Sequence, residues 1–299
     1  MNYRLLLYCC CLLFSGCSQN KNQQYIFIGH SYDWKAKDGN RVDPRIEQLD
    51  LSKYDQIWLG GDICARTSED PATLSYLDEL FGITKNNCHW ALGNHDINKG
   101  NPALIEQKTG RPSFYSHYTD GLTFLVLNTN LGHPQLPAPD SSALCQQLNQ
   151  QFSLLKKVCD TIQESAYLIL LHHHALISNE LADHQINVSD KWHYVWPALP
   201  FACTPTGSFE ELAYPILTKV QQKGTQVVLI GGDIGQRSKG FEFQTKEGIW
   251  FLGSGINNSM DPRYVPEYVT NRNPDSILVF DYDLEKQKLE WTFEALGGD

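Results

Sequence analysis

Short apolar runs that end in glycine recur along this chain and predict buried strands. The runs are residues 25–28 before Gly29, 56–59 before Gly60 and 227–230 before Gly231. Two further apolar runs, 122–127 and 167–171, end at Asn128 and His172. Continuous apolar runs of this length, followed by residues that favour turns, are typical of strands covered on both faces.

Segments with the periodicity of amphipathic helices lie between these runs, at residues 73–81, 144–164 and 210–223. Alternating strands and helices predict an α/β sheet. In the last third of the chain, residues 248–252, 276–282 and 288–294 are short strand-like runs joined by turns, which predict a second, partly antiparallel sheet. No linker rich in Pro, Gly or Ser divides the sequence, so residues 25–299 are expected to form one domain.

The N-terminal residues follow another pattern. Arg4 precedes an apolar run over residues 5–14, and Ser15 and Gly16 stand directly before Cys17. The run is too short to span a bilayer, and it resembles a bacterial lipoprotein signal, in which residues 1–16 are removed and Cys17 is lipidated. Residues 17–24 would then tether the domain to the membrane. The expected location is the cell envelope, at the periplasmic side of the outer membrane. An ordinary secretory signal is the alternative, because Phe14 stands where lipoprotein signals favour Leu.

Charge and cysteine content narrow the choice of partners. The chain has 24 basic and 34 acidic residues, a formal net charge of −10, and loss of the signal with Arg4 makes it more negative. Nucleic acid is therefore not an expected partner. No Cys-x-x-Cys pair is present, which excludes a zinc ribbon. In an oxidising compartment one or two disulfides are expected, and Cys145 with Cys159 is a guess at one pair.

Residues of metal-ligand type stand at the ends of several predicted strands. Asp62 follows Gly60-Gly61, the segment Gly93-Asn94-His95-Asp96 follows residues 90–92, and His172-His173-His174 follows the run at 167–171. Ligands of open α/β sheets bind beyond the carboxyl ends of the strands, so these side chains are expected to meet. Oxygen and imidazole donors suit Mn, Fe or Zn, and one or two such ions are the expected cofactor.

In this order, the motifs resemble those of the calcineurin-like metallophosphoesterases. That family shows Asp-x-His, Gly-Asp, Gly-Asn-His-Asp, a His-rich strand exit and Gly-His-x-His. The resemblance implies an α/β fold of four layers, with two mixed β-sheets flanked by helices. It implies that Asp62 bridges two metals, that Asn94 and His173 bind the second, and that His95 protonates the leaving group. Asp96 is expected to assist His95 in catalysis.

Two motifs depart from the family pattern. His30 and Tyr32 stand where the first motif has Asp and His, while Asp233 and Gly235 stand where the fifth has its two His residues. Those two loops face each other in the family, so the exchange is compatible with His30 and Asp233 both acting as ligands. One metal position is then complete and the other is weak. Alternatively, His30 caps or hydrogen-bonds a loop and Tyr32 only packs.

Arg66 and Arg237 each follow an Asp by four residues, within the repeated sequence Gly-Gly-Asp-Ile. Guanidinium groups suit substrate oxyanions, and His174 is a third candidate for substrate binding. Surface salt bridges are the alternative for the two arginines. The repeat is either a coincidence of Gly-rich strand ends or the sign of two half-domains that each direct an Asp to a shared site.

The expected function is hydrolysis of a small-molecule or polymer-linked phosphoester by a metal-activated water, with the protein anchored to the membrane by its lipid. One alternative is a degenerate family member with one metal or none, which binds an envelope polymer or lipid headgroup. Another is hydrolysis of an ester that contains no phosphate. The aromatic segment at 192–196 either walls the substrate pocket or covers the sheet.

Overall fold

The computed structural model describes residues 22–33, 35–132, 140–178, 199–233, 240–256 and 275–297. The expected signal at residues 1–16, Cys17, Gly235, Arg237 and the aromatic segment at 192–196 lie outside these residues. Among the residues that are described, no helix combines the length and the apolar character needed to cross a membrane.

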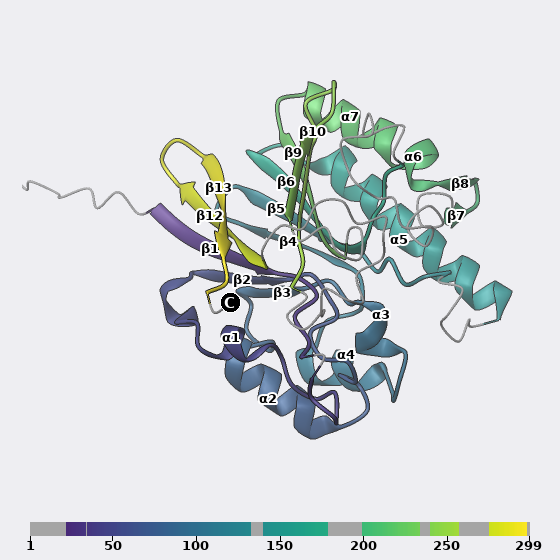
Figure 1. Cartoon of the computed structure of the whole chain (residues 1–299). Coiled ribbons are helices and arrows are strands. Elements are labelled where there is room, and N and C mark those ends of the chain that lie inside the picture. Colours follow the sequence, from purple (N-terminus) through teal and green to yellow (C-terminus); the bar gives the residue numbers. More distant parts are fainter. Residues whose placement is uncertain are drawn as a thin grey trace, which may run out of the picture.

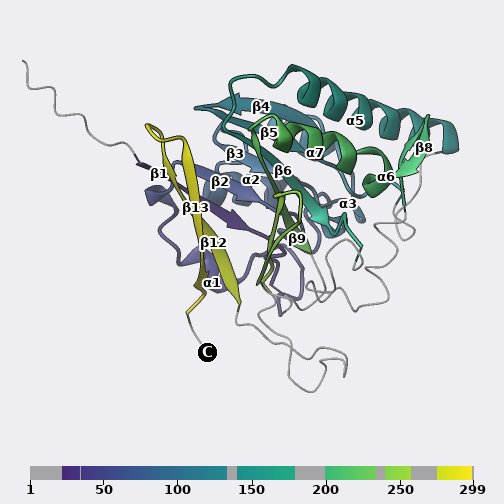
Figure 2. The ribbon, with the colours of Figure 1, turned by 90° about the horizontal axis from the view of Figure 1, so that it is seen from above.

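Two mixed sheets stack face to face, and helices cover their outer faces (Figures 1 and 2). Apolar side chains fill three separate layers, one between the sheets and one beneath the helices on each side. The expected α/β fold with two mixed sheets flanked by helices is therefore confirmed.

The first sheet has five strands in the order β13-β12-β1-β2-β3. Its strands are β1 (Asn22–Ile28), β2 (Gln56–Leu59), β3 (Cys88–Trp90), β12 (Ser276–Asp283) and β13 (Lys288–Ala295). β1, β2 and β3 are parallel, whereas β12 and β13 form an antiparallel hairpin at one edge. The helices on its outer side are α1 (Pro44–Glu47), α2 (Pro71–Phe81) and α4 (Ala103–Thr109), and a 3-10 helix spans Leu51–Lys53.

The second sheet has six strands in the order β10-β11-β9-β6-β5-β4. They are β4 (Tyr115–Thr119), β5 (Leu122–Val126), β6 (Tyr167–His174), β9 (Gln226–Asp233), β10 (Gly240–Gln244) and β11 (Trp250–Ser254). The four inner strands are parallel and the two edge strands are antiparallel to them. On its outer side lie α5 (Ser141–Thr161), α6 (Phe209–Leu212), α7 (Tyr214–Gln222) and a small hairpin of β7 (Pro200–Cys203) and β8 (Thr206–Ser208).

Several boundaries differ from the sequence-based expectation for local reasons. β1 begins at Asn22 rather than residue 25, because residues 22–24 pair with β12. These three residues therefore belong to the sheet and not to the expected tether. The helix expected at 210–223 is two helices, with Pro215 in the first turn of the second. Proline has no backbone N–H, so it favours the first turn of a new helix over the middle of a continuing one.

The guess of a Cys145–Cys159 disulfide is wrong. Cys145 is bonded to Cys203, with 5.4 Å between their Cα atoms, and Cys159 is a buried free thiol. Cys145 and Cys159 lie on the same helix, α5, about 21 Å apart along its axis at 1.5 Å per residue, too far for a disulfide. The bond instead holds the β7–β8 hairpin against α5. Asn149 supports it, because its Oδ1 accepts the Cys203 N–H at 2.9 Å.

Backbones of the two sheets touch where β2 and β9 end. A Cβ built on Gly232 would lie 2.0 Å from the Gly60 carbonyl oxygen, and one built on Gly60 would lie 2.8 Å from the Gly232 Cα. Only glycine at both positions allows this approach. The contact brings the carboxyl ends of strands from different sheets to the same point.

Replacing Gly232 by alanine is expected to lower the free energy of unfolding by about 1–3 kcal/mol, because the new methyl group would overlap the Gly60 backbone. Chemical denaturation measures the change. Gly297→Ala is the matched control, since a Cβ at Gly297 would meet no atom within 4 Å. Equal stability of the two variants would contradict the close contact of the sheets.

Removing the disulfide with the double change Cys145→Ser and Cys203→Ser is expected to lower the free energy of unfolding by about 2–4 kcal/mol. The reason is that the bond closes a loop between residues 58 positions apart. Wild-type protein under reductant should match the double variant, and the variant itself should not respond to reductant. Peptide mapping of the oxidised chain that joined Cys159 to either residue would refute the observed pairing.

Candidate metal centre

Asp62 stands at the turn that follows β2, and its side chain is buried. The turn needs positive φ at Gly61 (86°) and at Asp62 itself (52°), the latter a conformation that costs energy for a residue with a Cβ. The Asp62 Oδ1 accepts the backbone N–H of His95 at 2.7 Å. This bond leaves Oδ2 facing the centre of the cluster.

Asp96 holds this turn in place. Its Oδ2 accepts the N–H groups of Asp62 and Gly93 at 2.9 and 2.8 Å, and its Oδ1 accepts from Ile63 N–H and the Thr67 hydroxyl. Burial, and then the charge of Asp62, raise the pKa of Asp96 to about 6. Among these partners there is no atom of the His95 ring. Asp96 therefore holds the loops together, and its expected assistance to His95 in catalysis stays a prediction.

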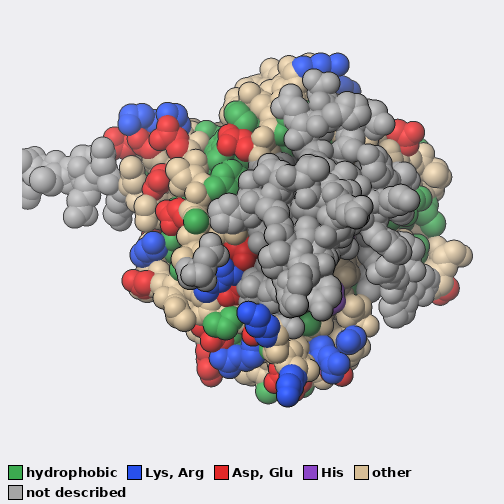
Figure 3. Space-filling view, viewed as in Figure 1, with side chains coloured by type: hydrophobic (Ala, Val, Ile, Leu, Met, Phe, Trp, Pro, Cys, Tyr) green, Lys and Arg blue, Asp and Glu red, His purple; other side chains and the backbone are tan. Residues whose placement is uncertain are grey.

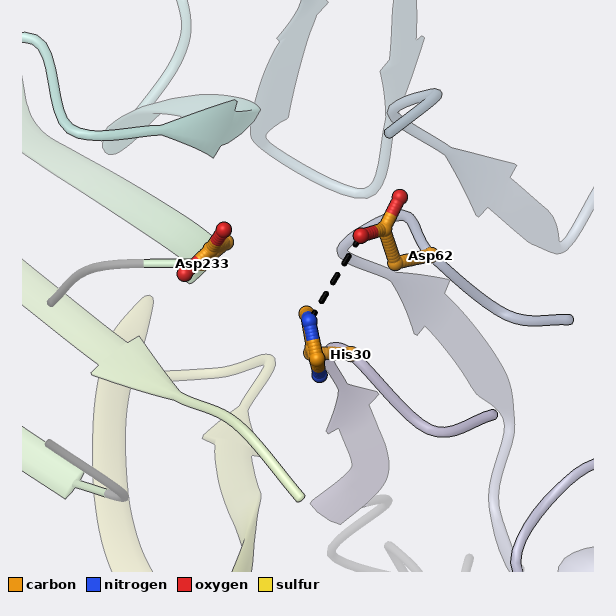
Figure 4. Close-up of side chains that lie close together, drawn as sticks. All are labelled: His30, Asp62 and Asp233. Carbon is orange, nitrogen blue, oxygen red and sulfur yellow. Dashed lines mark ion pairs between the residues drawn. The ribbon is translucent and has the colours of Figure 1, made fainter. Parts of the chain in front are cut away.

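The Asp62 carboxylate lies between two imidazole rings. Its Oδ2 is 3.5 Å from His30 Nε2 and 3.4 Å from His173 Nε2. Asp233 faces it from the end of β9, with its Oδ2 3.9 Å from His173 Nε2. Donor atoms of His30, Asp62 and Asp233 all lie within 4.8 Å of one another. Figure 4 shows how these three side chains lie at the ends of their strands. The two Gly-Gly-Asp segments therefore do direct their Asp residues to a shared site.

Both imidazoles present Nε2 to the carboxylates and use Nδ1 elsewhere. His173 Nδ1 donates to the Gly60 carbonyl at 2.6 Å, and His30 Nδ1 donates to the Ile256 carbonyl at 3.3 Å. Histidines that bind metals commonly anchor their second nitrogen in this way, which fixes the tautomer and aims the other nitrogen at the ion. Both residues thus have the anchored Nδ1 and the inward Nε2 that a metal ligand would need.

The donor set fits a divalent cation. His173 is fully buried, and its Nε2 has no hydrogen-bond partner among the described residues. Two donors about 2.1 Å from one ion at the tetrahedral angle lie about 3.4 Å apart, close to the spacing of Asp62 from each imidazole. Burial alone would lower the pKa of His173, but Asp62 and Asp233 raise it to about 9. The carboxylates thus attract positive charge to Nε2.

Burial also disfavours the charge on Asp62. It alone would raise the pKa of the Asp62 carboxyl, but His173, then His95 and His30, hold that pKa well below its usual range. The carboxylate therefore stays ionised in the interior of the protein. A buried anion of this kind is stable only with a neighbouring positive charge, supplied by a proton on imidazole or by a metal ion.

Asn94 and His174 lie beside this cluster and contact each other. Asn94 begins the short helix α3 (Asn94–Ile97), and its Oδ1 accepts the His174 Nε2–H at 3.1 Å. His174 is 2 % exposed, and its Nδ1 is 3.0 Å from the Thr129 hydroxyl oxygen. Both ring nitrogens of His174 have partners within the protein, and the substrate contact that the sequence suggested for it stays a prediction.

Tyr32 packs against other rings and Arg66 forms an ion pair, as the alternatives given for them in the sequence describe. The Tyr32 ring lies between His30 and His95, with centroid distances of 4.9 and 4.8 Å, so it packs. Burial, followed by the charges of Asp62 and Asp233, raises the pKa of its hydroxyl well above the usual range. Arg66 is partly exposed and forms an ion pair with Glu69 at 3.5 Å. Arg237 lies outside the described residues.

Sequence patterns did not reveal three groups that shape the site. The carbonyls of Gly60 and Ile256 anchor the two imidazoles, and backbone groups carry no residue-type signal. The Thr129 hydroxyl contacts both the ring and the backbone N–H of His174. Its position two residues after the apolar run at 122–127 was the one available clue.

A model of the calcineurin-like phosphoesterases matches residues 40–198, more than half of the chain. The chain belongs to the calcineurin-like phosphoesterase family. The matched range contains Asp62, Asn94, His95 and His173, but neither His30 nor Asp233. The assignment of these last two residues as ligands therefore depends on the geometry above.

Two solved structures are similar to this chain, and the first of them supports the fold. The GAP50 protein described as the anchor in the inner membrane complex of Plasmodium matches with a TM-score of 0.56 at 11% identity, over 92% of this chain and 85% of that one. The phosphopantetheinyl hydrolase PptH from Mycobacterium tuberculosis matches with a TM-score of 0.48 at 14% identity, over 83% of this chain and 99% of that one. None of the curated proteins matches the chain.

Replacing His30 by Gln, or Asp233 by Asn, is expected to weaken Mn²⁺ or Zn²⁺ binding at least about 10-fold. Each change removes one donor from the cluster. Isothermal titration calorimetry of the metal-free protein measures the affinity. His117→Gln, at the far edge of the second sheet on β4, is the control and should bind as wild type. Wild-type affinity in both site variants would remove His30 and Asp233 from the ligand set.

Proposed function

We propose that this chain is a metal-dependent phosphoester hydrolase of the cell envelope. The observation that carries the proposal is the Asp62 carboxylate between two imidazoles that both present Nε2 while carbonyls hold their Nδ1 atoms. Membership of the calcineurin-like phosphoesterase family supports hydrolysis in general. Asp62, Asn94, His173, Asp233 and His30 are the residues proposed to hold one or two ions of Mn, Fe or Zn.

A bound divalent ion supplies a Lewis acid for the phosphoryl oxygens and lowers the pKa of water nearby. The residues of the chain do the rest. Asp62 and Asp233 bring negative charge that retains the cation, and His30 and His173 orient it. Water adds to phosphorus, the bond from phosphorus to the ester oxygen breaks, and the departing oxygen takes a proton.

His95 is the proposed donor of that proton. Its backbone N–H binds Asp62 Oδ1 at 2.7 Å, so its place relative to the cluster is fixed. Its side chain is partly exposed and packs on Tyr32, in contrast to the buried ligand His173. A histidine with access to solvent can recover its proton after each turnover, as a general acid must.

The proposed setting is the membrane surface. Lipidation at Cys17 would anchor the domain, and the substrate would be a phosphoester on a small molecule or on an envelope polymer. In the coloured parts of the face shown in Figure 3, acidic side chains are interspersed with lysines and arginines. A net charge of −10 disfavours nucleic acid as a substrate.

The second candidate function is binding without turnover, by a degenerate family member. The observation that favours it is Tyr32, whose ring fills the space between His30 and His95 where the family places a metal-binding histidine. The Plasmodium structural neighbour is itself described as an anchor. In this alternative the domain would keep one ion or none and hold an envelope polymer or lipid headgroup.

The test is turnover of a broad panel of phosphomonoesters and phosphodiesters by metal-loaded protein, beside metal analysis. His95→Gln is expected to lower kcat about 10²–10⁴-fold while metal content stays at the wild-type value, because a general acid is lost and no ligand is. His117→Gln should leave kcat unchanged. If metal-loaded wild type cleaves no phosphoester, binding without turnover is favoured. If it cleaves esters that contain no phosphate, the protein is a hydrolase of such esters instead.

A further inference from the structure

Three side chains form a line of hydrogen bonds behind the candidate ligands. The Thr129 hydroxyl oxygen is 3.0 Å from His174 Nδ1, and His174 Nε2 is 3.1 Å from Asn94 Oδ1. The same hydroxyl accepts the backbone N–H of His174 at 3.1 Å. Thr129 therefore holds His174 at two points, and the ring reaches Asn94 at a third.

The bond to Asn94 determines the proton positions along this line. An amide oxygen only accepts, so His174 Nε2 must carry a hydrogen that it donates to Asn94 Oδ1. A neutral imidazole with its hydrogen on Nε2 has a lone pair on Nδ1. The Thr129 hydroxyl oxygen lies 3.0 Å from Nδ1 and can supply its single proton to that lone pair. All three contacts are satisfied by one arrangement of hydrogens.

The surroundings make the arrangement rigid. His174 is 2 % exposed at the end of β6, and its backbone is paired in register with Asp233 on β9. Its ring meets the ring of His173 edge-on at 4.5 Å. Asn94 in turn precedes His95, whose N–H is bonded to the Asp62 carboxylate. The line thus joins the end of β6, beside His173, to the start of α3, beside His95.

We propose that Thr129 and His174 are positioning residues that turn the amide oxygen of Asn94, rather than its NH₂ group, toward the metal centre. The proposal rests on the proposed function, in which Asn94 is a ligand. An amide NH₂ has no lone pair for a cation, whereas the oxygen has two and can accept from His174 while binding an ion. Partners of this kind affect metal affinity about 10–100-fold.

Nitrogen NMR of the metal-free protein tests the proton arrangement without metal or activity. The expected His174 signal in wild type is that of a ring whose Nε2 carries a hydrogen. Thr129→Ser keeps the hydroxyl and should keep this signal, whereas Thr129→Val should change it. Thr123→Val is the matched control, since Thr123 lies on β5 and its hydroxyl contacts Ser165 rather than His174. A ring with its hydrogen on Nδ1 in wild type would overturn the inference.

Mn²⁺ affinity of the same variants, by calorimetry, tests the consequence. Thr129→Val is expected to bind Mn²⁺ about 10–100-fold more weakly, with Thr129→Ser and Thr123→Val near wild type. Thermal unfolding of each variant confirms that it is folded. If Asn94→Ala weakens binding but Thr129→Val does not, the positioning role is refuted and the metal centre stands. Absence of Mn²⁺ and Zn²⁺ binding by wild type would instead overturn the proposed function, and this inference with it.

Discussion

The contact between Gly60 and Gly232 is the constraint on which the geometry of the site depends. Each glycine ends a strand of a different sheet, and each is followed within two residues by an Asp that faces the other sheet. A side chain at either position would hold the sheets apart by about the width of a methyl group. The donor atoms of His30, Asp62 and Asp233 can lie within 4.8 Å of one another because no side chain separates the two strands there.

Close approach also concentrates charge in the interior. Asp62 is almost completely buried, Asp233 lies beside it, and the two would repel without a cation between them. The Nε2 atom of His173, between these carboxylates, accepts either a proton or a metal ion. The structure therefore stabilises positive charge at this point in either state, as the raised pKa of His173 shows. Stability of the loops and affinity for a cation have the same electrostatic origin.

Sequence patterns predicted the parts of the fold that repeat a simple rule. The buried run at residues 56–59 is β2 without change, and the residue types after strands led to Asp62, His173 and Asp233. Partners distant in sequence could not be deduced. The bond of Cys145 to Cys203 depends on how the β7–β8 hairpin packs on α5, and the role of Asp96 depends on N–H groups of another loop. The edge strand β4, whose burial alternates, gave only a weak apolar signal.

The exchange of His and Asp between the first and fifth motifs has a physical explanation in this geometry. A metal ion responds to the donor atoms around it, irrespective of which strand supplies each one. His30 and Asp233 approach the same point from opposite sheets, so exchanging an imidazole for a carboxylate conserves the donors and the net charge together. Tyr32 shows the limit of such compensation. Its ring packs between His30 and His95 and supplies no imidazole nitrogen there.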